Sequence, residues 1–554
     1  MEKKYSLYNI ILGWIVFFGA TLVYFLTMEP TVSLWDCGEF IATASKLEVG
    51  HPPGAPLYLM LARFFALFAG NDVTMISFYV NLFTVVASGA TIMFLFWTIT
   101  HLAKKFFNNQ ELTIASIIVI LGAGFIGASA YAFTDTFWFS AVEAEVYGLS
   151  SLFTAVVFWC ILKWENDADK PWADKWIILI AFIMGLSIGV HLLNLLTITA
   201  IVYVYYFKKF PISPKGIIIA GLVSFVLIAC MMWGVIVGSV ELASYFELFF
   251  VNSIGMPFHS GLLIYILLLI AALVIGMIIT HKDYAIKTQT AIVTLILVLV
   301  GVPFMASSPI MWILITAAIA GTIYYIAQKN KYVLNTIVNI AAVVMIGYSS
   351  YAMIIIRSNA NLPMDENNPD NVFALLSYLN REQYGSNPLF YGQYYNAAPD
   401  WNDDGSANVI EKYTYTPRGN KYVKVNNGIE YIWANEFTTI FPRMYSREAH
   451  HVRAYKHWAN IDEGKNTKRV IYDKERNSPS RGIYNVPTFS QNLAYFFNYQ
   501  VGHMYVRYFM WNFVGRQNDE QSHGELTNGN WISGINAIDK LFVGDQTHIS
   551  EKAK

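Results

Sequence analysis

The sequence Trp35-Asp36-Cys37-Gly38-Glu39-Phe40 follows the first long apolar segment of the chain, and Gly50-His51-Pro52-Pro53-Gly54 comes after a short amphipathic run. Two carboxylates, an imidazole and a rigid Pro-Pro turn therefore stand where a helix leaves a membrane. Ionisable groups in or beside a membrane are unfavourable by several kcal/mol unless they find partners. We therefore take this loop as the first candidate for a functional site and the rest of the chain as its scaffold.

The composition is that of a polytopic membrane protein. Of the 554 residues, 55% are hydrophobic and 14% are charged, whereas a soluble globular protein carries roughly 25% charged residues. The formal net charge of −1 offers no basic surface for nucleic acid. Cys37, Cys160 and Cys230 are far apart, so neither a disulfide framework nor a structural zinc site is expected.

The apolar segments predict a transmembrane helical bundle of about 11 spans, since a spanning helix takes about 20 apolar residues. The first segment is too long for the core of a signal peptide, so we interpret it as an uncleaved membrane helix. Segment 175–207 is either one long helix or two short helices broken around Gly189 and His191. The predicted spans are 10–27, 76–102, 112–132, 144–163, 175–190, 192–207, 215–238, 260–280, 288–305, 309–327 and 332–355.

Lysine pairs in alternate connections set the predicted orientation. By the positive-inside rule these connections are cytoplasmic, which places loop 28–75 and everything after Arg357 outside. A bacterial inner membrane with the site facing the periplasm is the expected location; in a eukaryote the same topology would mean the endoplasmic reticulum. The pairs are Lys3/Lys4, Lys104/Lys105, Lys170/Lys175, Lys208/Lys209, Lys282/Lys287 and Lys329/Lys331.

The composition changes at Arg357, where apolar runs give way to Asn, Asp, Gly, Pro and Tyr. This predicts a mainly α protein with a transmembrane catalytic domain over 1–356 and an extracytoplasmic α+β domain over 357–554. Within the second domain we expect a short amphipathic helix over 373–382 and an aromatic helix over 495–513. Alternating residues over 413–433 predict a hairpin that turns at Asn426-Asn427-Gly428.

Asp36 and Glu39 are three residues apart, so a helix would place them on one face. A carboxylate held there could act as general base toward a hydroxyl group. The alternative is that Asp36 only caps a helix over 37–47, with Glu39 completing a capping box. The local pattern leaves both interpretations open.

Four stretches of the chain share their pattern with one enzyme family. They are Trp35-Asp-Cys-Gly-Glu-Phe40, Gly50-His-Pro-Pro-Gly-Ala-Pro-Leu-Tyr58, Phe139-Ser-Ala-Val-Glu-Ala-Glu-Val-Tyr-Gly-Leu149 and Tyr499-Gln-Val-Gly-His-Met-Tyr-Val-Arg-Tyr-Phe-Met-Trp-Asn-Phe513. An acidic residue after the first membrane helix, followed by His-Pro-Pro, resembles the GT-C membrane glycosyltransferases. The sequences of these four stretches are similar to those of glycosyltransferase family 117, a protein O-mannosyltransferase-like family.

The resemblance implies a GT-C fold and the transfer of a sugar from a polyprenyl-phosphate donor to an acceptor hydroxyl on the extracytoplasmic face. The acceptor would be Ser or Thr of an exported protein, and no further cofactor is implied. The catalytic acidic residue of the family maps to Asp36, which would deprotonate the acceptor. In protein O-mannosyltransferases a second acidic residue follows at once, whereas here Cys37 and Gly38 intervene before Glu39, the second catalytic candidate.

The third stretch and the His-Pro-Pro turn supply further candidates for substrate binding. Glu143 and Tyr147 would share one helical face, whereas Glu145 points elsewhere. Relatives carry an acidic residue in this region, near the donor or the acceptor. The alternatives are a pair of solvated interfacial glutamates, and a plain turn at His51.

Other candidates would bind the donor phosphate. His191 and Asn194 lie between apolar segments near the outer face, where a lone histidine is more often a packing residue. Arg357 stands at the outer end of the last span, where its guanidinium could meet a phosphate or only snorkel to the interface. Arg507 is a further candidate in the C-terminal region.

Two other classes of function compete with a glycosyltransferase. A secondary transporter would place ionisable residues and broken helices at mid-membrane, whereas most predicted spans here lack charge at their centres. A non-catalytic protein of envelope polysaccharide assembly would not need Asp36. We predict no metal site, although the carboxylates of the two outer loops could gather around a divalent ion if the fold brought them together. The sugar, the acceptor and the oligomeric state stay open.

Overall fold

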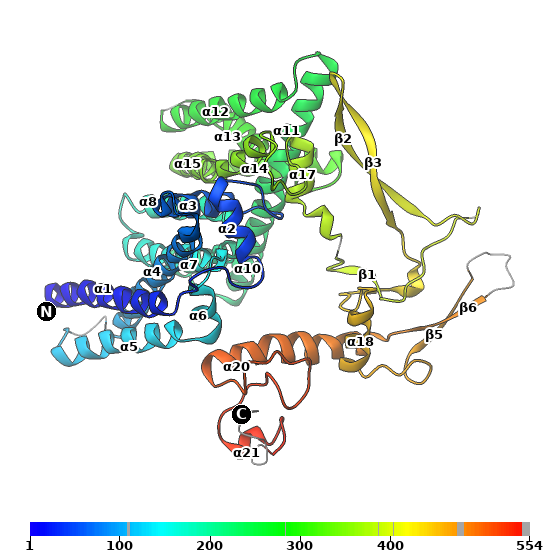
Figure 1. The fold of residues 1–554 in the computed structure, drawn as a ribbon. Helices are drawn as coiled ribbons and strands as arrows, with labels where there is room; N and C mark the ends of the chain where they lie inside the picture. The colour runs from blue at the N-terminus through cyan, green and yellow to red at the C-terminus, as the bar shows by residue number, and fades with distance from the viewer. Residues whose placement is uncertain (108–110, 283, 386, 403, 474–480, 546–554) are drawn as a thin grey trace. The chain divides into compact units, whose positions relative to one another are not determined.

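The computed structural model describes residues 1–107, 111–282, 284–385, 387–402, 404–473 and 481–545. The chain divides into two compact units. The first contains Met1–Gln383 and Thr416–Val423, and the second contains Tyr384–Tyr415 and Lys424–Lys554. Helices form nearly all of the first unit, and paired strands appear only in the later part of the described chain (Figure 1).

Within the described residues, eight helical segments are long and apolar enough to cross a membrane. They make the chain an integral membrane protein. Their helices pack mainly on neighbours in the sequence, with α4 contacting α1, α5 and α7. The segments are Glu2–Leu26 (α1), Val73–Lys105 (η2 and α4, Ile76–Lys105), Ile114–Ala132 (α5), Val146–Asp167 (α7), Pro214–Ser253 (α10, η4, α11 and η5), Ser260–His281 (α12), Pro309–Lys329 (α14) and Lys331–Ser358 (α15, η7 and α16).

The expected number of about eleven spans is not confirmed. Three of the expected spans are helical but short, namely α8 (Asp174–Ile188), α9 (Thr197–Lys209) and α13 (Ile286–Leu299). At 15 residues, α8 is about 22 Å long, less than the apolar thickness of a bilayer. The segment 175–207 is two helices, as one of the two alternatives had it. They separate at Gly189, whose carbonyl accepts hydrogen bonds from Leu57 N at 2.8 Å and Tyr58 N at 3.2 Å.

The loop after α1 contains two short helices that pack on the start of α4. They are α2 (Cys37–Lys46) and α3 (Pro56–Ala66). Proline suits the first turn of α3, where its missing N–H has no helical partner to lose. The ring of Tyr58 contacts the ring of Phe40 edge to face, at a centroid distance of 5.3 Å, and the tilted ring of Phe83 at 5.7 Å. This apolar contact fixes the position of α2, and with it that of Asp36 and Glu39.

The first unit extends beyond the predicted boundary after residue 356. The expected amphipathic helix forms as α17 (Val372–Leu379), capped by Asn371 Oδ1, which accepts from Phe373 N and Ala374 N. The helix packs on α11 (Ser239–Leu248), and Tyr378 Oη donates a 2.5 Å hydrogen bond to the carbonyl of Gly50. The residues after Arg357 therefore complete the loop that carries the candidate site.

The expected hairpin forms, but its turn is not where the sequence placed it. Strands β2 (Val409–Arg418) and β3 (Lys421–Tyr431) pair around Gly419, which has a φ of +59°. The predicted turn residues Asn426 to Gly428 lie inside β3, where Gly428 N donates to Asn426 Oδ1 at 2.8 Å. An Asn-Gly pair stabilises such a local Asx turn without reversing the chain.

The second unit is a mixture of short helices and two-stranded sheets, as expected for the C-terminal region. Its buried centre includes Phe437, Met444 and Val486. The aromatic stretch 495–513 is helical, as predicted. The elements are antiparallel β1 (Tyr391–Gln393) and β4 (Thr438–Ile440), antiparallel β5 (Lys468–Asp473) and β6 (Arg481–Val486), α18 (Ala449–Trp458), α19 (Phe489–Tyr495), a π-helical segment (Phe496–Val506), α20 (Arg507–Phe513) and α21 (Asn536–Asp539).

Candidate active site

Asp36 begins α2 but does not cap it with its side chain. Its carbonyl accepts the first helical hydrogen bond, from Phe40 N at 2.9 Å, while its carboxylate makes no capping bond. Capping residues usually have extended backbone angles, whereas Asp36 is already helical, at φ −78° and ψ −5°. The side chain is exposed. The capping interpretation of Asp36 is therefore not supported, and its carboxylate is accessible.

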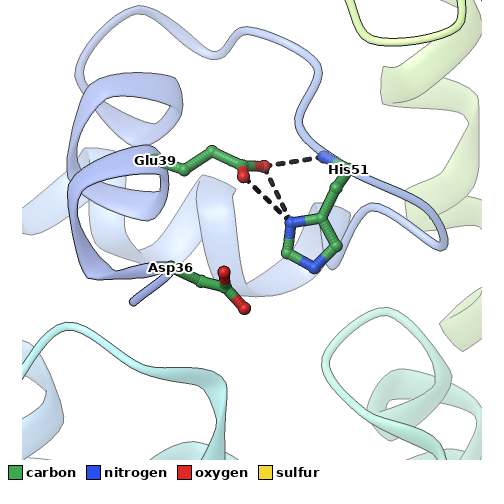
Figure 2. A group of neighbouring side chains, drawn as sticks. All are labelled: Asp36, Glu39 and His51. Carbon is green, nitrogen blue, oxygen red and sulfur yellow. Dashed lines mark hydrogen bonds and ion pairs between the residues drawn. The ribbon is translucent and has the colours of Figure 1, made fainter. Parts of the chain in front are cut away.

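Glu39 bonds to His51 and not to the start of its own helix. His51 N donates to Glu39 Oε1 at 2.7 Å, and His51 Nδ1 lies 2.9 and 3.0 Å from the two carboxylate oxygens. Figure 2 shows the carboxylates of Asp36, the residue before α2, and of Glu39, in its first turn, both close to the His51 ring. A Cβ on Gly50 would stand 2.3 Å from Glu39 Oε1, so glycine permits this close approach.

The contact between Glu39 and His51 behaves as an ion pair. The hydrogen bond from Glu39, together with its charge, raises the pKa of His51, although burial opposes the shift. Burial acts to raise the pKa of Glu39, but the hydrogen bonds and charge of His51 outweigh it and lower the pKa. The pair thus fixes the His-Pro-Pro turn to α2 and favours the protonated form of the imidazole that lies beside Asp36.

Two buried glutamates stand in the turn between α6 (Asp135–Ala141) and α7. Glu143 Oε2 accepts from Ser33 Oγ at 2.5 Å, and Glu145 Oε1 accepts from the Cys37 thiol at 3.8 Å. Burial raises the pKa of Glu143. Burial and the charge of Asp36 raise the pKa of Glu145 to about 7. Burial also raises the pKa of Cys37 to about 12, which keeps the thiol protonated as a donor.

The structure brings most of the predicted site residues together around Asp36. The negative charge of Asp36 interacts electrostatically with His51, Glu145 and Tyr147. The Tyr147 ring, 48% exposed, lies 5.4 Å from the ring of His191, measured between centroids. The result is a partly exposed group of carboxylates, imidazoles and a tyrosine ring.

Three predicted residues have other surroundings. Asn194 is fully buried and interacts with Thr197, whose Oγ1 lies 3.4 Å from its side-chain oxygen. Arg357 donates to the carbonyls of Leu47 at 2.7 Å and Lys46 at 2.8 Å, so its guanidinium holds the C-terminal end of α2. Arg507 belongs to the second unit and is buried there. Its guanidinium donates to the carbonyls of His503, Gly529 and Ser522.

Sequence reasoning missed Arg381, a cation next to the site. It is exposed, has a φ of +55° and follows α17, with its N–H donating to Tyr378 O at 3.1 Å. The positive charge of Arg381 interacts electrostatically with both Tyr147 and His191. The only sequence signal was its place in the last turn of the predicted helix over 373–382, and nothing in the pattern connected that helix with the first loop.

Asp36, Glu39 and His51 are also the residues that could hold a divalent ion, since one ligand atom from each lies within 4.8 Å of the others. Two carboxylates and an imidazole form a set that transition metals accept. A ligating imidazole must be neutral, however, and here the bond from Glu39 favours its protonated form. An ion bound to these three residues would have to replace the contact between Glu39 and His51.

Comparisons with known proteins match two parts of the chain. Residues 36–213 match the family described as the protein O-mannosyl-transferase TMEM260 N-terminal domain. Residues 385–497 match a family of unknown function, DUF8416. Over 221 residues, 38% of this chain, the sequence is 23% identical to protein O-mannosyl-transferase tmem260 of Dictyostelium discoideum. Over 174 residues, 31% of this chain, it is 27% identical to protein O-mannosyl-transferase TMEM260 of Mus musculus.

These matches support the resemblance to an O-mannosyltransferase-like family of membrane glycosyltransferases. They span only 24% of the length of the Dictyostelium relative and 22% of the mouse relative. No solved structure matches the chain. The match over 36–213 begins at Asp36 and includes the whole group of carboxylates, whereas Arg357, Arg381 and Arg507 lie outside it.

Proposed function

We propose that this chain, whose residues 36–213 are similar to the N-terminal domain of protein O-mannosyl-transferases, is a membrane glycosyltransferase. It transfers a sugar from a polyprenyl-phosphate donor to a hydroxyl of an exported protein, on the extracytoplasmic side of the membrane. The observation that carries the proposal is the Asp36 carboxylate, which is exposed, makes no capping bond and stands at the centre of the charged groups.

Asp36 is the general base of the proposed reaction. It removes the proton of the acceptor hydroxyl as that oxygen attacks the anomeric carbon. The bond between this carbon and the phosphate oxygen breaks, and the polyprenyl phosphate leaves with the electron pair. Because phosphate is already a good leaving group, one base is enough, in contrast to the two carboxylates of glycoside hydrolases.

The neighbouring groups keep Asp36 available for this role. Glu39 is committed to His51 through three contacts of 2.7–3.0 Å, which makes it a positioning residue in this proposal. Glu145, with a pKa of about 7, is partly protonated at neutral pH and so limits the negative charge around the base. The hydrogen bond from Glu39 favours the protonated form of His51, which lies next to Asp36.

Arg381 is the cation we assign to the donor phosphate. Planar guanidinium groups bind phosphate oxygens in pairs, and Arg381 acts on Tyr147 and His191 at the edge of the site. Arg357 instead uses Nε and Nη2 to hold α2. The side of Tyr147, His191 and Arg381 would face the donor, and Glu145, whose charge interacts with Tyr147, would lie close to it.

The variant Asp36→Asn tests the proposal, since asparagine keeps the shape of the side chain and removes the base. General-base catalysis contributes about 10²–10⁴-fold to rate, so transfer from a mannosyl polyprenyl phosphate to an acceptor peptide should fall by at least about 100-fold. Binding of the donor and thermal stability should match the wild type.

Asp72→Asn is a matched control, because Asp72 is an exposed aspartate of the same outer loop whose carboxylate accepts hydrogen bonds from Thr74, and asparagine keeps that capping role. It should transfer at the wild-type rate. Near-normal transfer by purified Asp36→Asn would exclude Asp36 as the base. The absence of transfer by the wild type, with sugar donors of several kinds, would count against a glycosyltransferase.

A further inference from the structure

A second cavity lies at the opposite end of the helices that carry the candidate site. It has a volume of about 730 Å³ and lies among the ends of α1, α4, α7 and α9. α4 starts beside the first loop, where Asn81 donates to the carbonyls of Glu29 and Thr31, and ends at Lys105 in the cavity. Its charged lining residues include Glu2, Lys104, Lys105, Lys163, Glu165 and Lys208.

Positive charge exceeds negative charge in this lining, because four lysines face two glutamates. Of these four lysines, Lys163 alone makes no ion pair within the described residues, and its Nζ lies 4.8 Å from the centroid of the Trp159 ring. A half-buried cation without a carboxylate favours an anion as its neighbour. The other lysines pair as Lys104 with Glu2 at 2.7 Å, Lys105 with Glu165, and Lys208 with Asp169 at 3.4 Å.

One part of the lining carries a buried acceptor that lacks a donor within the described residues. Asn9 Oδ1 has no hydrogen-bond partner within the described residues, although it lines the cavity. The carbonyl of Asn9 accepts from Trp97 Nε1 at 3.1 Å, which fixes the backbone there. Buried polar atoms are rarely left without a partner, so a ligand that carries a hydroxyl group fits this part of the lining.

The cavity also borders the lipid-facing side of α1. Ile10, which lines the cavity, is 49% exposed, and Trp14 on the next turn is 46% exposed. In a membrane protein, such apolar side chains of a spanning helix face acyl chains. A lipid can therefore reach the cavity from the side, with its chains along α1 and its headgroup among the lysines.

We propose that this cavity binds the headgroup of an anionic phospholipid with a free hydroxyl, such as phosphatidylglycerol. The phosphate pairs with Lys163, the hydroxyl donates to Asn9 Oδ1, and the acyl chains follow α1. Basic pockets between transmembrane helices bind anionic headgroups in this way. The site is independent of the glycosyltransferase proposal, because none of its residues belongs to the group around Asp36.

The test is lipid binding to the full chain, purified in a neutral detergent and titrated with phosphatidylglycerol or phosphatidylcholine in native mass spectrometry. Phosphatidylglycerol should bind more tightly. One lysine near anionic lipid contributes about 1 kcal/mol, or about fivefold, so Lys163→Gln should weaken phosphatidylglycerol by about that factor. Lys215→Gln is the control, because Lys215 is an exposed lysine of α10 that does not line the cavity.

A second variant and a competitor make the result decisive. Asn9→Ala should reduce the preference for phosphatidylglycerol over phosphatidic acid, which lacks the headgroup hydroxyl, even if Lys163→Gln were to fold poorly. Equal binding of phosphatidylglycerol and phosphatidylcholine, or equal losses in Lys163→Gln and Lys215→Gln, would overturn the proposal. Displacement of the lipid by millimolar inorganic phosphate would assign the cavity to free phosphate instead.

Discussion

Glu145 and Glu247 are both buried in the first unit, at 6% and 1% exposure, but their surroundings differ. Glu247, in α11, accepts three hydrogen bonds, from His259 N at 2.6 Å, Leu262 N at 3.0 Å and Tyr422 Oη at 3.1 Å. A carboxylate with this many donors is stable inside a protein. Glu247 thereby caps the start of α12 and holds the tip of the β2–β3 hairpin.

Glu145 has far weaker partners. Among the described residues it accepts from Val146 N at 3.3 Å and from the thiol of Cys37 at 3.8 Å, and the charge of Asp36 is nearby. Burial and the charge of Asp36 raise its pKa to about 7, because these two hydrogen bonds are too weak to offset them. The comparison shows that burial alone does not mark a functional carboxylate. A functional carboxylate is better indicated by burial with too few hydrogen-bond donors, next to a second carboxylate that is exposed.

After that of Asp36→Asn, the largest effect that we expect comes from the loss of Arg381, the cation next to the candidate site. Arg381→Ala should lower kcat/KM for the lipid-linked donor about 10- to 100-fold, because hydrogen bonds to charged groups contribute about 1.5–3 kcal/mol. Arg381→Lys should recover part of this loss, since it keeps the charge without the planar fork.

Thermal unfolding of both Arg381 variants should match the wild type, because the residue is exposed. Steady-state kinetics with varied donor concentration would check the prediction. A change only in KM for the acceptor would move Arg381 to the acceptor side, and unchanged kinetics would remove it from the site.

The well-satisfied carboxylate should matter for stability and not for catalysis. Glu247→Gln loses one acceptor oxygen and leaves a buried donor unsatisfied, which costs about 1–3 kcal/mol. Glu145→Gln should change stability far less, because Glu145 is already partly protonated at pH 7. Denaturant or thermal unfolding of the two variants would measure the difference. Equal destabilisation by both would show that the two carboxylates are alike.

The pattern of the sequence predicted the first loop well, because apolar length and local charge depend only on neighbouring residues. The helical fold and the short helix after Arg357 could be expected from such patterns, and the family resemblance pointed to Asp36 and to the region of Glu143 and Glu145. The number of spans could not, because α8, α9 and α13 end sooner than the apolar segments suggested.

The partners of individual side chains were harder to predict, because they depend on contacts far apart in the sequence. Glu39 has the spacing of a capping box, yet it bonds to His51, twelve residues on. Arg357 bonds to the carbonyls of Lys46 and Leu47, more than 300 residues away. Arg381 reaches the site because Tyr378 bonds to Gly50. No local pattern contains this information.

The ion pair of Glu39 and His51 should give the loop a stability that depends on pH. The raised pKa of His51 means that its contribution is complete below about 6.5 and is lost as pH rises through its folded value. The lowered pKa of Glu39 means that its contribution is present above about 4.5 and is lost as pH falls through its folded value. The pair is therefore strongest between these limits.

Hydrogen exchange of the segment 47–55 would measure this dependence. Protection should be greatest between about pH 4.5 and 6.5 and should fall on both sides. Because both side chains are partly exposed, we expect the effect to stay below about 1 kcal/mol. In Glu39→Gln the protection should no longer depend on pH in this range. A pH-independent wild type would mean that the contact is an ordinary hydrogen bond.

The smallest effect should come from the charge on Glu145. As pH rises through about 7, Glu145 ionises and its negative charge repels the phosphate of the donor. KM for the donor should therefore increase between pH 6 and 8, by up to about fivefold if the repulsion is about 1 kcal/mol. Glu145→Gln should keep the low KM across this range, because the amide imitates the protonated acid. Glu247→Gln should keep the rise of the wild type, since Glu247 has three donors of its own and lies on another helix. Initial rates at several donor concentrations and pH values would decide the matter. An increase in KM that persisted in Glu145→Gln would assign the titration to another group, and a decrease would mean that Glu145 faces the acceptor and not the donor.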